Sequence, residues 1–312
     1  MSAEFILPEA DSMSFRIPLL PSYKTAQLHW RDYFELTKPK VVALILLTAL
    51  VGMLVAQTRL PDWQLIFWAF TGIALLSGSA ACFNHVLDRN IDQKMARTYM
   101  RPVAKGRVEQ GQAVTFASML ALLGFALLYY FVNPLTAWLT FASLLGYALV
   151  YTVFLKRYTP QNIVIGGLAG AMPPLLGWTS VTGEVAPNAL LLVLIIFTWT
   201  PPHFWALAIH RKNEYKNANV PMLPVTHGIE FTKTMILSYT VLLLLVSLLP
   251  WLNGLFSSFY AVMVGFLNLY FIIYAVRLKW FDRPLLAYKM FKFSVWHLLW
   301  VFVVMLLDHF ML

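Results

Sequence analysis

The chain has 312 residues, of which 60% are hydrophobic and only 12% are Asp, Glu, Lys or Arg. Soluble domains are roughly half apolar and about a quarter charged, so this composition excludes an ordinary soluble domain and predicts an integral membrane protein. The formal net charge is +9. Basic residues placed at a membrane surface account for that charge without a nucleic-acid partner. The single cysteine, Cys82, excludes an internal disulfide.

Nine apolar stretches have about the length, roughly 20 residues, that the hydrocarbon core of a bilayer requires. They lie near residues 40–57, 63–85, 113–132, 135–155, 162–181, 188–210, 235–253, 257–276 and 292–311. We therefore predict an all-α bundle of nine transmembrane helices, divided into a cytoplasmic segment at 1–39 and a single membrane domain at 40–312.

The distribution of Lys and Arg predicts the orientation of this bundle, because basic residues near span ends favour the cytoplasm. With the N-terminus inside, 22 of the 23 basic residues fall on the cytoplasmic side, and only Arg59 lies outside. The segment 1–39 has no apolar core of the signal-peptide type and carries five acidic residues, which are rare in mitochondrial transit peptides. We expect a bacterial cytoplasmic (inner) membrane, with anionic lipid at its inner face.

A polar motif lies at the end of the second apolar stretch, where Asn84, Asp88 and Asp92 are spaced at i, i+4 and i+8. On a continuous helix these three side chains lie near one face, each about 6 Å further along the axis. Mg²⁺ takes one or two carboxylates, several waters and phosphate oxygens of a substrate. The motif therefore predicts a site for a metal and a diphosphate at a helix end.

Basic residues follow this motif in the loop 84–112, and a second long internal loop, 210–234, emerges on the same predicted face. The first loop contains Arg97, Arg101 and Lys105, which suit phosphate oxygens. The second loop contains Glu214, which we interpret as a further ligand that faces the first motif. The active site is therefore expected at the cytoplasmic face.

Other interpretations explain parts of this pattern. Polar helix ends at a membrane surface are commonly just solvated. A transporter also carries polar residues in its spans, but its site normally lies near the midplane, whereas these acids lie at helix ends. A structural subunit of a respiratory complex has no use for aligned acids. The combination of acids, adjacent bases and a second acidic loop favours an enzyme.

Several segments together resemble the UbiA superfamily of intramembrane prenyltransferases. The first motif and the following Arg97–Pro102 carry the resemblance to the superfamily as a whole. Four further segments are similar to its heme-farnesylating members, and they are Tyr151–Asn162, Gly166–Trp178, Thr200–Ala208 and Pro221–Val225. The resemblance spans roughly residues 30–300.

The resemblance implies Mg²⁺-dependent transfer of a farnesyl group from farnesyl diphosphate to a vinyl group of heme B, with addition of water, to give heme O. It assigns Asp88, Asp92 and Glu214 as metal ligands, and Asn84 as a ligand or a donor to the diphosphate. It assigns the diphosphate to a set of bases, namely Arg97, Arg101, Lys156, Arg157 and, more weakly, Lys105. It also implies an association with heme A synthase or with terminal oxidase assembly.

Two points depart from this pattern or stay open. Many members of the superfamily carry a second Asp-xxx-Asp, whereas Glu214 is followed four residues later by Ala218. A prenyltransferase for another acceptor, such as an aromatic acid or a quinone precursor, remains an alternative. His203 and, less so, His85 are the candidates for contact with heme, although an isolated histidine in a membrane more often bonds to a neighbouring helix.

Overall fold

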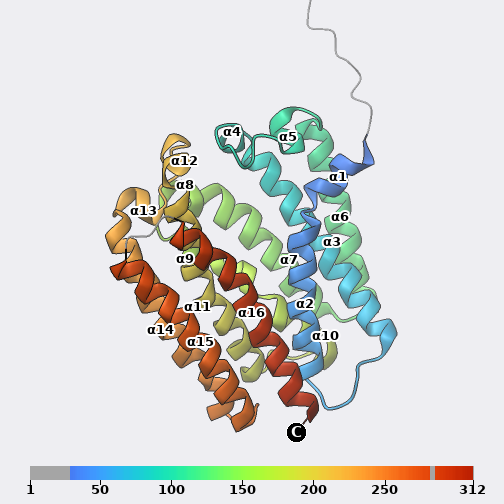
Figure 1. The fold of residues 1–312 in the computed structure, drawn as a ribbon. Helices are drawn as coiled ribbons and strands as arrows, with labels where there is room; N and C mark the ends of the chain where they lie inside the picture. Colours follow the sequence, from blue (N-terminus) through green and yellow to red (C-terminus); the bar gives the residue numbers. More distant parts are fainter. Residues whose placement is uncertain (1–28, 282–284, 312) are drawn as a thin grey trace, which may run out of the picture.

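The computed structural model describes residues 29–281 and 285–311, and within these ranges all regular structure is helical (Figure 1). The first half comprises α1 (Trp30–Leu36), α2 (Pro39–Val55), α3 (Trp63–Leu87), α4 (Arg89–Asp92), α5 (Pro102–Lys105), α6 (Gln110–Phe131), α7 (Pro134–Leu145), the π-helix η1 (Gly146–Leu155) and α8 (Lys156–Tyr158). The second half comprises α9 (Asn162–Ala171), α10 (Pro173–Thr182), α11 (Pro187–His210), α12 (Lys212–Asn217), α13 (Leu223–Thr226), α14 (Ile229–Leu252), α15 (Ser258–Trp280) and α16 (Leu286–Met311).

The predicted all-α membrane bundle is confirmed for the described residues. Eight helical segments are long and apolar enough to cross a membrane, and the pair α1 and α2, bent by 48°, brings the number up to nine if it counts as one span. Nine spans and a cytoplasmic N-terminus therefore stay predictions. So does the division at 39/40, because residues 1–28 lie outside the described residues.

The helices extend beyond the predicted apolar stretches at several ends. Helix α14 begins at Ile229 rather than 235, and α16 begins at Leu286 rather than 292. Their first turns contain polar residues such as Glu230 and Lys289, which hydropathy alone excludes from a span. Helices continue through the interfacial region because their backbone hydrogen bonds stay satisfied there.

Two glycines allow α2 and α10 to cross at close range. A Cβ atom built on Gly177 lies 1.8 Å from the carbonyl oxygen of Ala49, and one built on Gly52 lies 2.0 Å from that of Pro174. Small residues of this kind let helix backbones approach each other in membranes, where packing drives helix association. The close crossing fixes α10 against the N-terminal half of the bundle.

Two spans are interrupted. The first lies at Pro173, where a proline is expected to bend or break a helix: α9 ends at Ala171 and α10 begins at Pro173. The second interruption was not predicted: α7 passes into η1, where Thr152 Oγ1 donates to the carbonyl oxygen of Tyr147 at 2.9 Å. A π-helix changes the direction of every side chain that follows it. Helix α8, with Lys156, therefore starts in a register that a regular helix would not give.

The short helices gather at one end of the bundle. Figure 1 shows α1, α4, α5, α8, α12 and α13 at its upper end, together with the ends of α3 and α11. This end carries the polar motif after α3 and the second acidic loop after α11. The two loops that the sequence predicted on one face therefore lie at the same end of the molecule.

Candidate active site

The polar motif does not lie on one helix. Helix α3 ends at Leu87, Asp88 is its C-cap with φ −89° and ψ 2°, and Asp92 belongs to the separate helix α4. The prediction of one continuous helical face is therefore wrong for Asp92. The backbone N–H groups of Asp88 and Asp92 still bond four residues back, at 2.9 and 2.8 Å. The chain changes direction at Asp88, and the two carboxylates take different partners.

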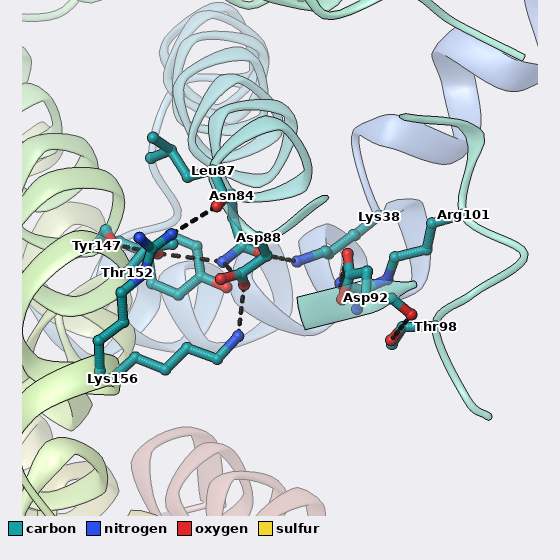
Figure 2. A network of polar contacts seen from close by, with 11 residues as sticks. Lys38, Asn84, Leu87, Asp88, Asp92, Thr98, Arg101, Tyr147, Thr152 and Lys156 are labelled. Atoms are coloured by element: carbon teal, nitrogen blue, oxygen red, sulfur yellow. Dashed lines mark hydrogen bonds and ion pairs between the residues drawn. The ribbon is translucent and has the colours of Figure 1, made fainter. Parts of the chain in front are cut away.

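Asn84 is the centre of a buried polar network. Its Oδ1 accepts a hydrogen bond from Lys38 Nζ at 2.7 Å. Its Nδ2 donates to Asp88 Oδ2 at 2.8 Å and to Thr152 Oγ1 at 3.1 Å. Figure 2 shows that these partners come from three parts of the chain: the α1–α2 connection, the end of α3 and η1. Both the oxygen and the nitrogen of the Asn84 amide therefore make hydrogen bonds, as buried polar groups normally do.

Asp88 forms an ion pair with Lys156, whose Nζ lies 2.5 Å from Oδ2. The carboxylate is 1% exposed, and its other oxygen, Oδ1, has no hydrogen-bond partner among the described residues (Figure 2). A buried carboxylate oxygen without a partner is costly, because it loses hydration without compensation. Asp88 Oδ1 is therefore suited to an incoming cation.

Asp92 is held by Arg101 in a two-pronged contact, with Nη1 at 2.9 and 2.8 Å from the two carboxylate oxygens. Thr98 Oγ1 donates to the backbone carbonyl of Asp92 at 3.2 Å, which closes the loop between them. The predicted roles of Asp92 as a metal ligand and of Arg101 as a diphosphate base stay predictions, and in this structure the two side chains pair with each other. Because this pair is buried on the Asp92 side, it restrains the whole loop 93–101.

The other predicted bases lie in different settings. Arg157 Nη2 donates to the carbonyl oxygen of Leu87, the last residue of α3, at 2.7 Å. Lys105 Nζ lies 6.0 Å from the ring centroid of Tyr99 and belongs to an exposed residue. Arg97 is also exposed, without a carboxylate partner among the described residues. Arg157 thus supports the helix end, while Arg97 and Lys105 remain free to meet an anion.

Glu214 lies in α12 and pairs with Arg211, whose Nη1 lies 2.6 Å from Oε1. Its Oε2 is buried and has no hydrogen-bond partner in the described part of the chain, which repeats the situation of Asp88. The adjacent Tyr215 is buried, and burial raises the pKa of its hydroxyl, against the opposing effect of Arg97 and Arg211. Tyr215 therefore stays a hydrogen-bond donor at neutral pH.

The acids are not gathered into one cluster. Within residues 29–281 and 285–311, no group of three or more His, Cys, Asp or Glu side chains is placed to hold a metal ion. Instead, each acid of the predicted set holds a base: Asp88 holds Lys156, Asp92 holds Arg101, and Glu214 holds Arg211. Mg²⁺ needs only one or two carboxylates besides water and phosphate. The unpartnered oxygens of Asp88 and Glu214 fit such a role.

The two histidines proposed for heme contact are both buried. His85 is 2% exposed, and neither ring nitrogen has a partner among the described residues. His203 is 8% exposed, and its Nδ1 lies 2.6 Å from Ser294 Oγ of α16. His203 thus makes the bond to a neighbouring helix that an isolated intramembrane histidine usually makes.

Sequence reasoning missed Lys38 and Thr152 as parts of the site. In the sequence Lys38 is one of several basic residues near a span end, yet it reaches Asn84 from 46 residues away. Its position before Pro39, where the chain avoids the helical region, was the available signal for a special conformation. Thr152 carries no comparable signal, since its contact depends on the register of η1.

Acids that each pair with a base at one end of an apolar helix bundle are typical of the functional sites of membrane proteins, where ionisable side chains are otherwise rare. The chain belongs to the UbiA prenyltransferase family, whose family model matches residues 45–305. It is a transferase of that family.

Two relatives have high identity over nearly their whole length. A protein named protoheme IX farnesyltransferase from Shewanella denitrificans is 60% identical over 311 residues, which cover 100% of this chain and 99% of the relative. A protein with the same name from Idiomarina loihiensis is 60% identical over 287 residues, with 92% and 96% covered.

Solved structures share the fold at low identity. A structure of digeranylgeranylglyceryl phosphate synthase matches with a TM-score of 0.76 at 20% identity, covering 91% of this chain and 99% of that chain. A UbiA homologue from Archaeoglobus fulgidus bound to GPP and Mg²⁺ matches with a TM-score of 0.61 at 14% identity, covering 88% and 99%. These likenesses establish the arrangement of helices.

Proposed function

We propose that this protein transfers the farnesyl group of farnesyl diphosphate to a vinyl group of heme B, with addition of water, and releases heme O and diphosphate. The observation that carries the reaction type is the Asn84–Asp88 pair with Lys38 and Lys156 beside it. The names of the relatives at 60% identity supply the acceptor and the donor. An aromatic or quinone-precursor acceptor remains the alternative to be tested.

Magnesium is the cofactor that these residues fit. Asp88 and Glu214 each keep one carboxylate oxygen without a hydrogen-bond partner in the described residues, whereas Asp92 would first have to release Arg101, which holds both of its oxygens. Bound Mg²⁺ neutralises charge on the leaving diphosphate. Asn84 orients Asp88 through the 2.8 Å hydrogen bond and keeps Oδ1 available. The Mg²⁺ bound to the Archaeoglobus fulgidus homologue supports the choice of ion.

The bases of the site bind the diphosphate by exchanging partners. Lys156 and Arg101 neutralise Asp88 and Asp92 while no substrate is bound. With a cation on these carboxylates, Lys156 and Arg101 would be available to the diphosphate oxygens, which would keep the charge of the buried site balanced. Such a balance matters because an unpaired buried charge costs several kcal/mol. Lys38, Arg97, Lys105 and Arg157 complete the positive surroundings.

We place the site at the cytoplasmic face of a bacterial inner membrane. The basis is the distribution of Lys and Arg, of which all but Arg59 fall on one side of the predicted topology. Farnesyl diphosphate then meets the site from the cytoplasm, and heme B enters from the bilayer. Heme A synthase or a terminal oxidase is the partner class that would take up heme O.

A product-mass assay tests this function. Membranes with the protein are incubated with farnesyl diphosphate, Mg²⁺ and either heme B or 4-hydroxybenzoate. We expect a farnesyl-plus-water adduct of heme B only. Asp88→Asn should abolish it, whereas Asp62→Asn, which retains the N-cap of α3, should leave it unchanged. Prenylation of 4-hydroxybenzoate without a heme adduct would contradict the proposed acceptor.

A further inference from the structure

A row of aromatic rings follows the contact between α11 and α16. Successive ring centroids lie 4.8 Å (His210–Tyr288), 6.2 Å (Tyr288–Phe291), 4.6 Å (Phe291–His203) and 4.3 Å (His203–Trp199) apart. The row starts at His210, the last residue of α11, and reaches Trp199, about three helical turns further into the bundle. We call these five residues the α11–α16 ring row.

Ser294 fixes the imidazole of His203. The Ser294 hydroxyl has a single hydrogen, and its Oγ donates to the backbone carbonyl of Phe291 at 2.7 Å. We assign that hydrogen to the Phe291 carbonyl, so that in the 2.6 Å contact with His203 the Nδ1–H group donates and Oγ accepts. A neutral imidazole has one N–H, so this pattern assigns the lone pair to Nε2.

The imidazole is held in place while Nε2 is left open. Trp199 stacks on the ring at 4.3 Å with an interplanar angle of 19°, and its own Nε1 donates to the carbonyl oxygen of Ser294 at 3.0 Å. Phe291 packs at 4.6 Å. Within the described residues His203 Nε2 makes no hydrogen bond. It is also not one of the fully buried polar atoms that lack a partner. His203 therefore presents a preorganised nitrogen ligand.

Two lysines flank the outer part of the row. Lys292 Nζ lies 4.6 Å over the Tyr288 ring, and Lys289 precedes it by three residues on the same face of α16. Both are exposed, and neither pairs with a carboxylate in the part of the chain that the structure describes. Both lie in the first two turns of α16, at the end of the bundle where the ring row begins, so their charges are available to an anion there.

We propose that heme B binds along the α11–α16 ring row, with His203 Nε2 as ligand to the heme iron and Ser294 as the residue that positions it. A porphyrin is a flat aromatic ring with two propionates at one edge, which matches a row of rings flanked by Lys289 and Lys292. An imidazole nitrogen is a common ligand of heme iron. This proposal rests on the proposed function, because it locates the acceptor of that reaction.

The test is heme binding without farnesyl diphosphate. Ferric heme B is titrated into purified protein in detergent, and ligation is followed by the Soret band and by electron paramagnetic resonance. We expect imidazole ligation in the wild type and its loss in His203→Ala and His203→Gln. His297→Phe is the matched control. Like His203, His297 of α16 is buried, but neither of its ring nitrogens makes a hydrogen bond among the described residues.

The Ser294 variants test positioning separately from ligation. Ser294→Ala should weaken heme binding about tenfold and shift the Soret band, because the imidazole loses the acceptor that sets its tautomer. Ser294→Thr retains a hydroxyl and should restore the wild-type spectrum. A Ser294→Ala protein with the wild-type spectrum and affinity would contradict the positioning role.

The lysines are tested with two ligands. Lys292→Met should weaken binding of heme B about fivefold and leave binding of heme B dimethyl ester unchanged, because esterification removes the propionate charges. An equal loss for both ligands contradicts the pairing of Lys292 with propionate.

The proposal and the proposed function fail in different ways. Wild-type protein that ligates heme through His203 but never farnesylates it contradicts the function and leaves the heme site standing. Protein that farnesylates heme B while His203→Ala and His203→Gln keep the wild-type spectrum overturns the heme site and leaves the function standing.

Discussion

Lys38 stands out among the single residues of the site because it is a non-glycine residue in the left-handed region, with φ 51° and ψ 59°. This conformation costs free energy in a residue with a side chain, so an observed case suggests a function. Here it directs the ammonium to Asn84 Oδ1 at 2.7 Å (Figure 2). We infer that Lys38 takes part in binding the diphosphate.

Replacing Lys38 tests this role. Lys38→Met should raise the KM for farnesyl diphosphate about 10- to 100-fold, since a hydrogen bond from a charged group contributes about 1.5–3 kcal/mol. Lys40→Met is the matched control, because Lys40 follows Pro39 and is exposed. It should change KM less than about twofold. Equal effects of the two variants on KM would argue against a specific contact.

The residue scale also shows what the sequence predicts and what it does not. Spacing and residue type predicted Asn84, Asp88 and Arg101 as members of one site. The same spacing was wrong about one helical face, because a run of i, i+4 contacts does not reveal that α3 ends at Leu87. Contacts from distant segments, such as that of Lys38, depend on tertiary packing, which a local pattern does not encode.

At the scale of single elements, glycines decide how closely helices pack. Small residues such as Gly166, Gly167 and Gly170 of α9 are the kind that let helices approach closely. A Cβ on Gly166 would lie 2.1 Å from the Tyr151 ring, and one on Gly167 would lie 3.0 Å from Thr200, so these two glycines are at close contacts. Gly170 is not, because a Cβ there would have nothing within 4 Å.

Gly177→Ala and Gly170→Ala form a matched pair. The new methyl group of Gly177→Ala meets the Ala49 carbonyl at 1.8 Å, so α2 and α10 must separate. Overpacking of this kind costs about 1–3 kcal/mol and more where backbone atoms clash. We expect a lower melting temperature in detergent for Gly177→Ala and no loss for Gly170→Ala, measured by thermal unfolding followed by size-exclusion chromatography. A melting temperature of Gly177→Ala equal to that of the wild type would contradict the close contact of α2 with α10 at this position.

The π-helix η1 was not predicted from the sequence. Its residues, Gly146–Leu155, read as an ordinary apolar span, because π and α hydrogen bonding share the same composition. Its effect on the site is direct: Thr152 and Lys156 reach Asn84 and Asp88 from it and from the turn after it. Apolar composition predicts that a span exists, but side-chain direction within it follows from backbone register.

At the scale of the whole molecule, topology determines which compartment the site faces. With Cys82 replaced by Ser, a single cysteine introduced at Thr58 should react with an impermeant maleimide in intact cells. A cysteine at Asn213 should react only after the membrane is opened. Both positions are exposed in the structure. The opposite labelling pattern would place the site outside and would contradict the orientation predicted from Lys and Arg.

The proposed reaction requires that Asp88 bind a cation in place of Lys156 when the diphosphate binds. The most direct measurement is calorimetric titration of purified protein with farnesyl thiolodiphosphate, which does not ionise readily, in Mg²⁺ and in EDTA. We predict binding that needs Mg²⁺ in the wild type and is at least about tenfold weaker in Asp88→Asn. Wild-type affinity that is the same in EDTA, or Asp88→Asn protein with unchanged Mg²⁺-dependent affinity, would contradict the account.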